Sequence, residues 1–251
     1  MVLKIGGFNS GVLVLAVVLH ILFYYALHKL KSKPQDILNS VVFCYLLIIA
    51  SLLVSSLIYD SFFDGNAYHQ EAVVRLRDGW NPYYKAVPDA SAHNHVVNFP
   101  KFTWVYASVI SDIFGNIELG KSYNIIFLLA AFFYTLAFTQ KFQSNKLVSL
   151  GLALLFVLNP FTLALLFSYY VDGLIALLVL ISLLALINFE QSTDNSGRIE
   201  NLLLLTAVSI LAINAKFNGF ACGIILVAYI LKALCQKQYQ NTFWLTAGGG
   251  G

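Results

Sequence analysis

The chain has 251 residues, of which 59% are apolar (AVILMFWYC) and 11% are charged, and its formal net charge is +3. An ordinary soluble domain is about a quarter charged, and a compact globule must cover its surface with polar groups. The composition therefore excludes a water-soluble globule, a disordered chain, a disulfide-stapled secreted module and a nucleic-acid-binding protein. It predicts a polytopic membrane protein. Cys44, Cys222 and Cys235 lie in or beside apolar segments, and we interpret them as inert thiols.

Long apolar runs predict an all-α bundle of transmembrane helices. The runs are continuous over roughly 20 residues, whereas the strands of outer-membrane barrels alternate over about 10. We expect seven spans and part of an eighth, which begins at Phe243. The seven expected spans are residues 11–26, 37–59, 122–139, 147–168, 173–189, 201–214 and 220–234.

Basic residues in short loops predict the topology. Lysines occur in the loops at 29–33, 141–146 and 232–237, and positive charge in short loops marks the cytoplasmic side. The N-terminus and the long polar interval 60–121 are then outside. We divide the chain into an additional N-terminal helix with its cytoplasmic loop, residues 1–36, and a transmembrane core, residues 37–251. Four glycines end the sequence, so we expect this core to be truncated.

The outer interval is expected to contain two helices on the membrane surface, at 66–78 and 102–114, with an irregular stretch at 85–98. In the first helix one face carries Tyr68, Ala72, Val73 and Leu76. This helix is too short and too charged to span a bilayer. The sequence 79–82, Gly-Trp-Asn-Pro, is expected to end it, because proline cannot continue a helix.

Ionisable residues stand at the outer ends of several predicted spans. Asp60 and Asp64 follow the second span, Asp172 opens the fifth, and Lys216 follows the sixth, so the topology places all four on one side. Carboxylates there can act as general bases or bind a metal ion, and a lysine can hold a phosphate. A charge at a span end is more often a solvated anchor. Asp172 and Lys216 lie in very short apolar connections, which predicts partial burial.

Histidines and two further acids complete the polar residues of the interval. His69 follows Tyr68 and comes about one turn after Asp64, so we expect it to line the same site. The pair at 93 and 95, His-x-His, can offer two imidazoles to a metal, but the sequence supplies no third ligand. Asp112 and Glu118 are interpreted as surface residues.

These segments resemble the GT-C superfamily of integral-membrane glycosyltransferases, and especially bacterial protein mannosyltransferase and aminoarabinose transferase types. The resemblance runs from about residue 37 to 234. The motifs that carry it are Asp64-Gly65-Asn66-Ala67-Tyr68-His69, Gly79-Trp80-Asn81-Pro82-Tyr83, Asn98-Phe99-Pro100-Lys101, Asn159-Pro160, Tyr169-Tyr170-Val171-Asp172-Gly173 and Lys216-Phe217-Asn218-Gly219.

The resemblance implies a site and a reaction. Asp64 matches the first-loop aspartate that deprotonates the acceptor, Asp172 matches a second acidic position facing it, and Lys216 or Lys101 would hold the phosphate of a polyprenyl-phosphate sugar. His69, Tyr68 and Tyr170 join them as substrate-binding residues. In some members the first-loop aspartate helps to hold a divalent cation, so Asp64 and Asp172 are also candidate ligands for Mg or Mn.

Partners and location follow from the same resemblance. The donor is a polyprenyl-phosphate sugar lipid, and the acceptor is a hydroxyl or amine of a glycan, lipid or protein. The protein would cross a bacterial inner membrane several times with its site facing outward. Two departures stand out. The family often has adjacent acidic residues where Asp60 and Asp64 are four apart, and its C-terminal half is missing here, so this chain alone can be inactive.

Two other functions remain open. A secondary transporter would also have many spans and buried charges, and the Asn159-Pro160 break favours it, although we find no internal repeat. A non-catalytic membrane scaffold would account for the apolar bulk but would leave the long outer interval unexplained.

Overall fold

The computed structural model describes residues 34–82 and 93–235, and all the regular elements within these ranges are helical. The chain divides into two compact units. The first unit holds residues 1–126 and 167–170, and the second holds residues 127–166 and 171–251. Each unit is described by itself below.

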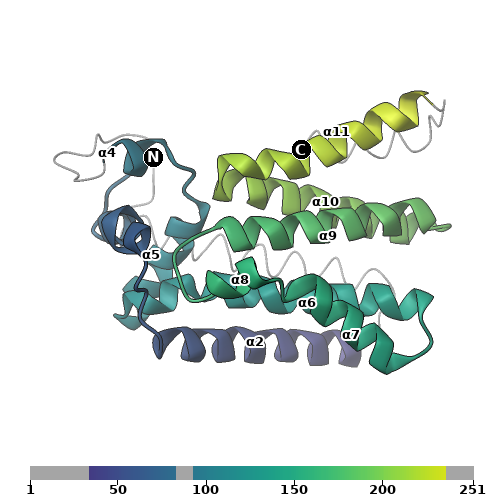
Figure 1. Cartoon of the computed structure of the whole chain (residues 1–251), viewed down its shortest axis with the longest axis horizontal. Helices are drawn as coiled ribbons and strands as arrows, with labels where there is room; N and C mark the ends of the chain where they lie inside the picture. The colour runs from purple at the N-terminus through teal and green to yellow at the C-terminus, as the bar shows by residue number, and fades with distance from the viewer. Residues whose placement is uncertain (1–33, 83–92, 236–251) are drawn as a thin grey trace. The chain divides into compact units, whose positions relative to one another are not determined.

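The first unit is built from one long apolar helix and several short ones (Figure 1). The 3₁₀ segment η2 packs against both α2 and α5, and α3 packs against α5. The elements of this unit are α2 (Pro34–Ser56), η1 (Gly65–His69), α3 (Gln70–Arg77), α4 (His93–Asn98), α5 (Phe102–Phe114), η2 (Ile117–Ser122) and the start of α6 (Tyr123–Phe142).

Both helices predicted for the interval 60–121 are present in the first unit, and they are called the surface helices below, although their position on a membrane surface stays a prediction. The first is a π-turn, η1, that continues into α3, and its predicted apolar face is buried at Tyr68, Ala72, Val73 and Leu76. It ends at Arg77, before Pro82, because Gly79 adopts φ +91° and the N–H groups of residues 79 and 80 bond back to the last turn. The second, α5, has the predicted bounds and stops where Gly115 adopts φ +70°.

The stretch between the surface helices is more regular than predicted where it can be seen. Residues 93–98 form α4, so the expectation of an irregular segment is wrong at this end. Residues 83–92 lie outside the described part of the chain.

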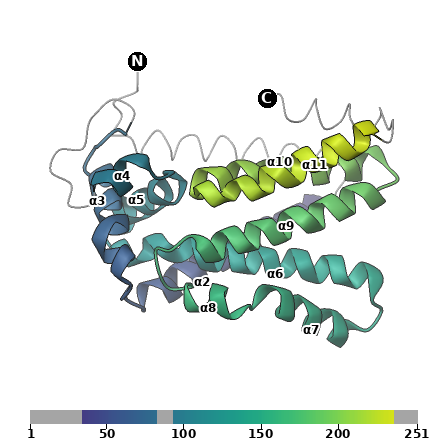
Figure 2. The same ribbon diagram turned by 45° about the horizontal axis from the view of Figure 1, so that its top comes forward.

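The second unit is a set of packed apolar helices. α10 lies beside α9 and α11 (Figure 2), and α8 packs on α9. Its core includes the cluster of Phe189, Leu202 and Tyr229. The elements of this unit are the remainder of α6, α7 (Lys146–Val157), α8 (Pro160–Ala164), α9 (Asp172–Gln191), α10 (Asn195–Ala215), η3 (Phe217–Gly219) and α11 (Phe220–Cys235).

Four described helices are long and apolar enough to cross a membrane: residues 35–56, 117–142, 172–191 and 195–215. They correspond to four of the seven predicted spans. Their outward apolar side chains fit a lipid environment, as at Leu46 and Leu53 of α2, which are 59% and 61% exposed. The expected spans at 11–26 and from Phe243 lie outside the described residues.

The predicted span at 147–168 is not one helix. α7 ends at Val157, and α8 begins at Pro160 with Asn159 as its extended N-cap residue. Proline disfavours helical backbone in the residue before it and lacks the N–H that would continue the helix, which explains the break. With 12 residues α7 is about 18 Å long, short of a hydrocarbon core of about 30 Å. The described part of α11 has 16 residues, and it ends where the described part of the chain ends.

Candidate functional site

Asp64 stands at the start of the first surface helix and is held by the turn that follows. It is the N-cap residue of η1 and is partly buried. The hydroxyl of Tyr68, one turn later, donates to Oδ2 of Asp64 at 3.1 Å. π-turns are rare and are frequent at functional sites. The predicted pair of Asp64 and Tyr68 is therefore brought together in the first unit.

His69 lies at the centre of an aromatic cluster. It is 4% exposed, and its Nδ1 accepts a hydrogen bond of 2.7 Å from Nε1 of Trp104, which is 1% exposed. The rings of Tyr169 and Tyr170 lie 6.5 Å and 6.2 Å from the His69 ring, centroid to centroid. Two of the predicted site residues, His69 and Tyr170, thus meet. Trp104 was not predicted, because its contact depends on how α5 docks on the first surface helix.

The helix α4 contributes a second histidine to the cluster. The ring of His95 stacks on Tyr68 at 4.8 Å with an interplanar angle of 19°. Phe99 meets both rings edge-on, at 5.6 Å from Tyr68 and 5.2 Å from His95. His95, considered as a metal ligand from sequence, is placed instead as an aromatic neighbour of Tyr68.

Lys101 joins the same cluster from the residue before α5. Its Nζ donates to the carbonyl oxygen of Val97 at 3.0 Å and to that of Phe99, and it lies 5.1 Å from the centroid of the Trp104 ring. Partial burial lowers the pKa of Lys101 from 10.5 to about 8, because desolvation disfavours the ammonium form.

A buried group of charges lies beside the cluster and was not predicted. Glu118 is 8% exposed and pairs with Lys121, which is completely buried, so the interpretation of Glu118 as a surface residue is wrong. Lys121 also donates to the carbonyl oxygen of Ile58, and the backbone N–H of Asp60 donates to Oε2 of Glu118 at 3.1 Å. The spacing Glu-x-x-Lys between two apolar runs was the available signal. Asp112, by contrast, is exposed, as expected.

Asp60 anchors the segment 167–170 within the first unit. It is completely buried, and its carboxylate accepts the backbone N–H of Phe62 at 3.0 Å and that of Tyr169 at 2.8 Å. Tyr123 donates to the carbonyl oxygen of Tyr169, and Asn124 donates to that of Ser168, each at 2.8 Å. Asp60 is therefore a structural anchor, and it holds the two tyrosines against His69.

The hydroxyl of Tyr169 is a hydrogen-bond donor in this segment. It donates to the carbonyl oxygen of Ile117. Burial raises the pKa of Tyr169 far above its ordinary value, and the charges of Glu118 and Asp60 raise it further. The phenol therefore stays protonated at any physiological pH.

Asp172 and Lys216 meet in the second unit. Nζ of Lys216 lies 2.5 Å from Oδ1 of Asp172, and their side chains are 31% and 26% exposed, which confirms the predicted partial burial. Asp172 is the first residue of α9, and Lys216 is the extended residue between α10 and η3. Lys216 is thus engaged by a carboxylate, so a phosphate would share it with Asp172.

Asp64 belongs to the first unit and Asp172 to the second, so the prediction that they face each other stays a prediction. Among the residues that the structure describes, no three His, Cys, Asp or Glu side chains gather closely enough to hold a metal ion. The proposed binding of Mg or Mn by Asp64 and Asp172 also stays a prediction, and no step below depends on it.

The second unit also contains a chain of hydrogen bonds that was not predicted. Lys141 donates to Asn188 at 2.7 Å, Asn188 donates to the hydroxyl of Tyr134 at 3.0 Å, and Tyr134 donates to Asn201 at 3.1 Å. This chain joins α6, α9 and α10. Polar side chains in apolar helices commonly bond across to neighbouring helices, and Asn188 near the end of a predicted span was the sequence signal.

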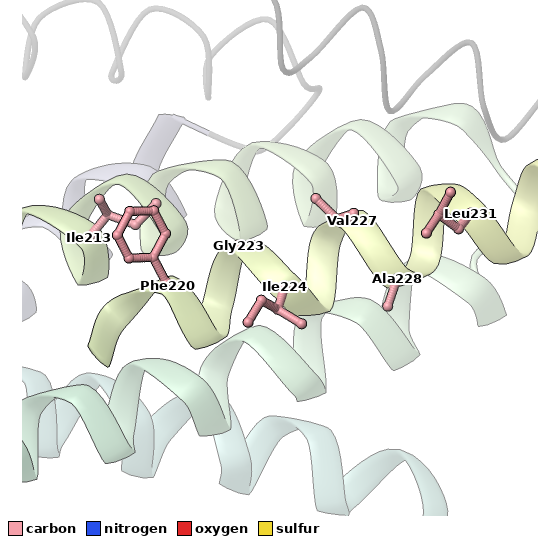
Figure 3. A pocket seen from close by; sticks show the side chains of 7 residues that line it. All are labelled: Ile213, Phe220, Gly223, Ile224, Val227, Ala228 and Leu231. Atoms are coloured by element: carbon pink, nitrogen blue, oxygen red, sulfur yellow. The ribbon is translucent and has the colours of Figure 1, made fainter. Parts of the chain in front are cut away.

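An apolar groove of about 470 Å³ lies along α10 and α11 (Figure 3). Only hydrocarbon groups line it, so it offers no donor or acceptor to a sugar or a phosphate. Its lining residues are Ile213, Phe220, Gly223, Ile224, Val227, Ala228 and Leu231.

Comparison of the chain with protein-family models, curated proteins and solved structures finds no significant match. The assignment of a function therefore depends on the residues described above.

Proposed function

We propose that this chain is a membrane glycosyltransferase that moves a sugar from a polyprenyl-phosphate donor to an acceptor hydroxyl or amine. The observation that carries the proposal is the convergence, within the first unit, of residues from separate motifs. Asp64 bonds to Tyr68, and His69 lies against Tyr170 and Trp104. Lys101 lies over the Trp104 ring. All of these residues except Trp104 are predicted site residues from the sequence alone.

The proposed chemistry needs one base and one cation. Tyr68 occupies Oδ2 of Asp64, so Oδ1 is the oxygen that we assign to the acceptor proton. As the acceptor oxygen loses this proton, it forms a bond to the anomeric carbon of the sugar. The bond from that carbon to the phosphate oxygen breaks, and polyprenyl phosphate leaves with the electron pair. Direct attack of this kind inverts the anomeric centre.

The cation would stabilise the negative charge that grows on the phosphate. Lys101 is the candidate in the first unit. Its neighbours are carbonyl oxygens and an aromatic ring, and no carboxylate of the described residues bonds to it. Lys216 in the second unit would first have to exchange Asp172 for phosphate. Lys101 is therefore the better placed of the two predicted lysines.

The test is transfer of labelled sugar from polyprenyl-phosphate donors, with the chain or a longer protein that contains it reconstituted in liposomes. Asp64→Asn keeps the size of the side chain but removes the base, so we expect transfer to fall by about 10²- to 10⁴-fold. Asp112→Asn, on an exposed residue of α5, is the matched control and should transfer normally. Wild-type turnover by Asp64→Asn would remove Asp64 from the mechanism.

The donor can be identified before the transfer assay. Native mass spectrometry of detergent-purified wild type, Lys101→Ala and Lys216→Ala would detect a co-purifying isoprenoid phosphate, and the mass of an attached sugar would narrow the donor. Loss of the lipid in Lys101→Ala but not in Lys216→Ala would support Lys101 as the residue that binds the phosphate of the donor.

A secondary transporter is the second candidate, because the break between α7 and α8 resembles the interrupted helices of such proteins. Counterflow of a solute across vesicles that contain the chain would favour this function, whereas the glycosyltransferase proposal predicts none.

A further inference from the structure

The hydrogen bond between Trp104 and His69 determines which nitrogen of the imidazole carries a proton. An indole N–H can only donate, so the 2.7 Å bond requires a lone pair on Nδ1 of His69. In a neutral imidazole the single proton must then be on Nε2. Protonation of Nδ1 would set two donors against each other, in a place where both side chains are almost completely buried.

The packing holds this arrangement. The Trp104 and His69 rings meet at 76° with centroids 5.6 Å apart, and Tyr68 and Tyr169 lie at tilted or stacked angles on the His69 ring. Asp60 fixes Tyr169 through its backbone N–H. The imidazole can therefore not flip to exchange its two nitrogens without opening this cluster.

We infer that Trp104 is a positioning residue that fixes His69 as a neutral imidazole with its proton on Nε2. This inference rests on the proposed function for its catalytic meaning: the lone pair of Nδ1 is taken by Trp104 and Nε2 carries the proton, so His69 is not the general base of the sugar-transfer site. The base is then Asp64 alone. Trp104 acts through His69 and makes no bond to the substrate.

The tautomer can be measured without any activity. The full chain is labelled with ¹⁵N-histidine, and the two ring nitrogens of His69 are observed by solid-state NMR in lipid bilayers, with assignment by the loss of signals in His69→Gln. We expect an unprotonated, pyridine-type Nδ1 and a protonated, pyrrole-type Nε2. The exposed His95 provides an internal comparison in the same spectrum.

The Trp104→Phe variant keeps an aromatic ring but removes the donor. We expect the two nitrogen signals of His69 to move toward each other as both tautomers become populated, and Trp80→Phe should leave them unchanged. Three results would each overturn the inference that Trp104 fixes the tautomer of His69. They are averaged nitrogen signals in the wild type, a protonated Nδ1 in the wild type, and an unchanged spectrum in Trp104→Phe. If Trp104→Phe does not fold, the wild-type spectrum still decides the tautomer.

The catalytic meaning is tested by transfer. Loss of the general base should cost far more activity than loss of a residue that is not the base, so we expect His69→Gln to retain at least about tenfold more activity than Asp64→Asn. Equal loss in both variants would overturn the assignment of the base to Asp64 alone. If wild type transfers no sugar from any donor, the proposed function fails, and the spectrum remains an independent test of the tautomer.

Discussion

Removal of the buried lysine in the first unit should destabilise the protein strongly. Lys121 is completely buried, and its ammonium group pairs with Glu118, whose side chain is 10% exposed. Within the described residues, Oε1 of Glu118 has no hydrogen-bond partner, so this carboxylate depends on Lys121. Breaking a buried ion pair typically costs 3–5 kcal/mol, because one charge is left uncompensated. We expect Lys121→Met to lower the free energy of unfolding by about 4 kcal/mol.

A double variant separates the ion pair from other effects of the substitution. Glu118→Gln removes the charge but retains a carbonyl oxygen that can accept the N–H of Asp60. Replacing both members of a buried pair is often far less costly than removing one. We therefore expect Lys121→Met with Glu118→Gln to recover about 2 kcal/mol relative to Lys121→Met alone.

The measurement is unfolding by SDS in mixed micelles, followed by the fluorescence of the buried Trp104. Lys146→Met, on an exposed lysine, is the control and should change stability by less than about 0.5 kcal/mol. The reasoning is refuted if Lys121→Met unfolds within about 1 kcal/mol of wild type, or if the double variant is no more stable than the single one.

Three further predictions concern other parts of the chain. With a pKa of about 8, roughly a quarter of Lys101 is neutral at pH 7.5, so acetylation by an active ester should be about tenfold faster there than at the exposed Lys146. Gly219→Ala places a Cβ 1.9 Å from a backbone carbonyl oxygen of α10 and should destabilise the protein by about 2 kcal/mol, whereas Gly151→Ala meets nothing. Asn188→Leu should cost roughly 1 kcal/mol in SDS unfolding, because it removes two interhelical bonds.

Specific outcomes would contradict these predictions. Equal acetylation of the two lysines, read by mass spectrometry, would show that Lys101 is not desolvated. The lowered pKa also predicts how stability depends on pH. The folded state holds the Lys101 proton less tightly than the unfolded state, so the contribution of Lys101 to the free energy of unfolding should increase as pH rises from about 8 to 10.5. Equal stability of the two glycine variants would contradict the close approach at Gly219. If Asn188→Leu is more stable than wild type, the hydrogen bonds of Asn188 to Lys141 and Tyr134 do not stabilise the protein.

Local sequence signals predicted the helices well. The bounds of α5 agree with the prediction, and the apolar face of the first surface helix is the buried one. The bounds and the buried face both depend on the spacing of apolar residues within a single helix, and this spacing can be read from the sequence. Pro160 also signals the break at residues 158–159, whereas the apolar run of 22 residues around it favours a single span.

Tertiary contacts account for what was missed. The role of Trp104 depends on the docking of α3 on α5, which brings it to a histidine 35 positions earlier in the chain. The Glu-x-x-Lys spacing of Glu118 and Lys121 lies between two apolar runs, but the same spacing also stabilises exposed helices, so it does not by itself indicate burial. Their burial follows from the packing of α2 and α5 on η2.

Asp172 and Lys216 show that a correct prediction of partial burial can miss the contact that the two side chains make. The topology placed both residues at one face, and the short connections predicted their partial burial. It did not predict that Lys216 would meet Asp172 at 2.5 Å. An ammonium group beside a carboxylate attracts a second anion less strongly than an isolated one, because the two local charges offset each other. A phosphate that binds there must displace the carboxylate or accept its repulsion. Lys101 contacts carbonyl oxygens and an indole ring, and no described carboxylate bonds to it. This difference is the physical reason to test Lys101 first as the ligand of a phosphate.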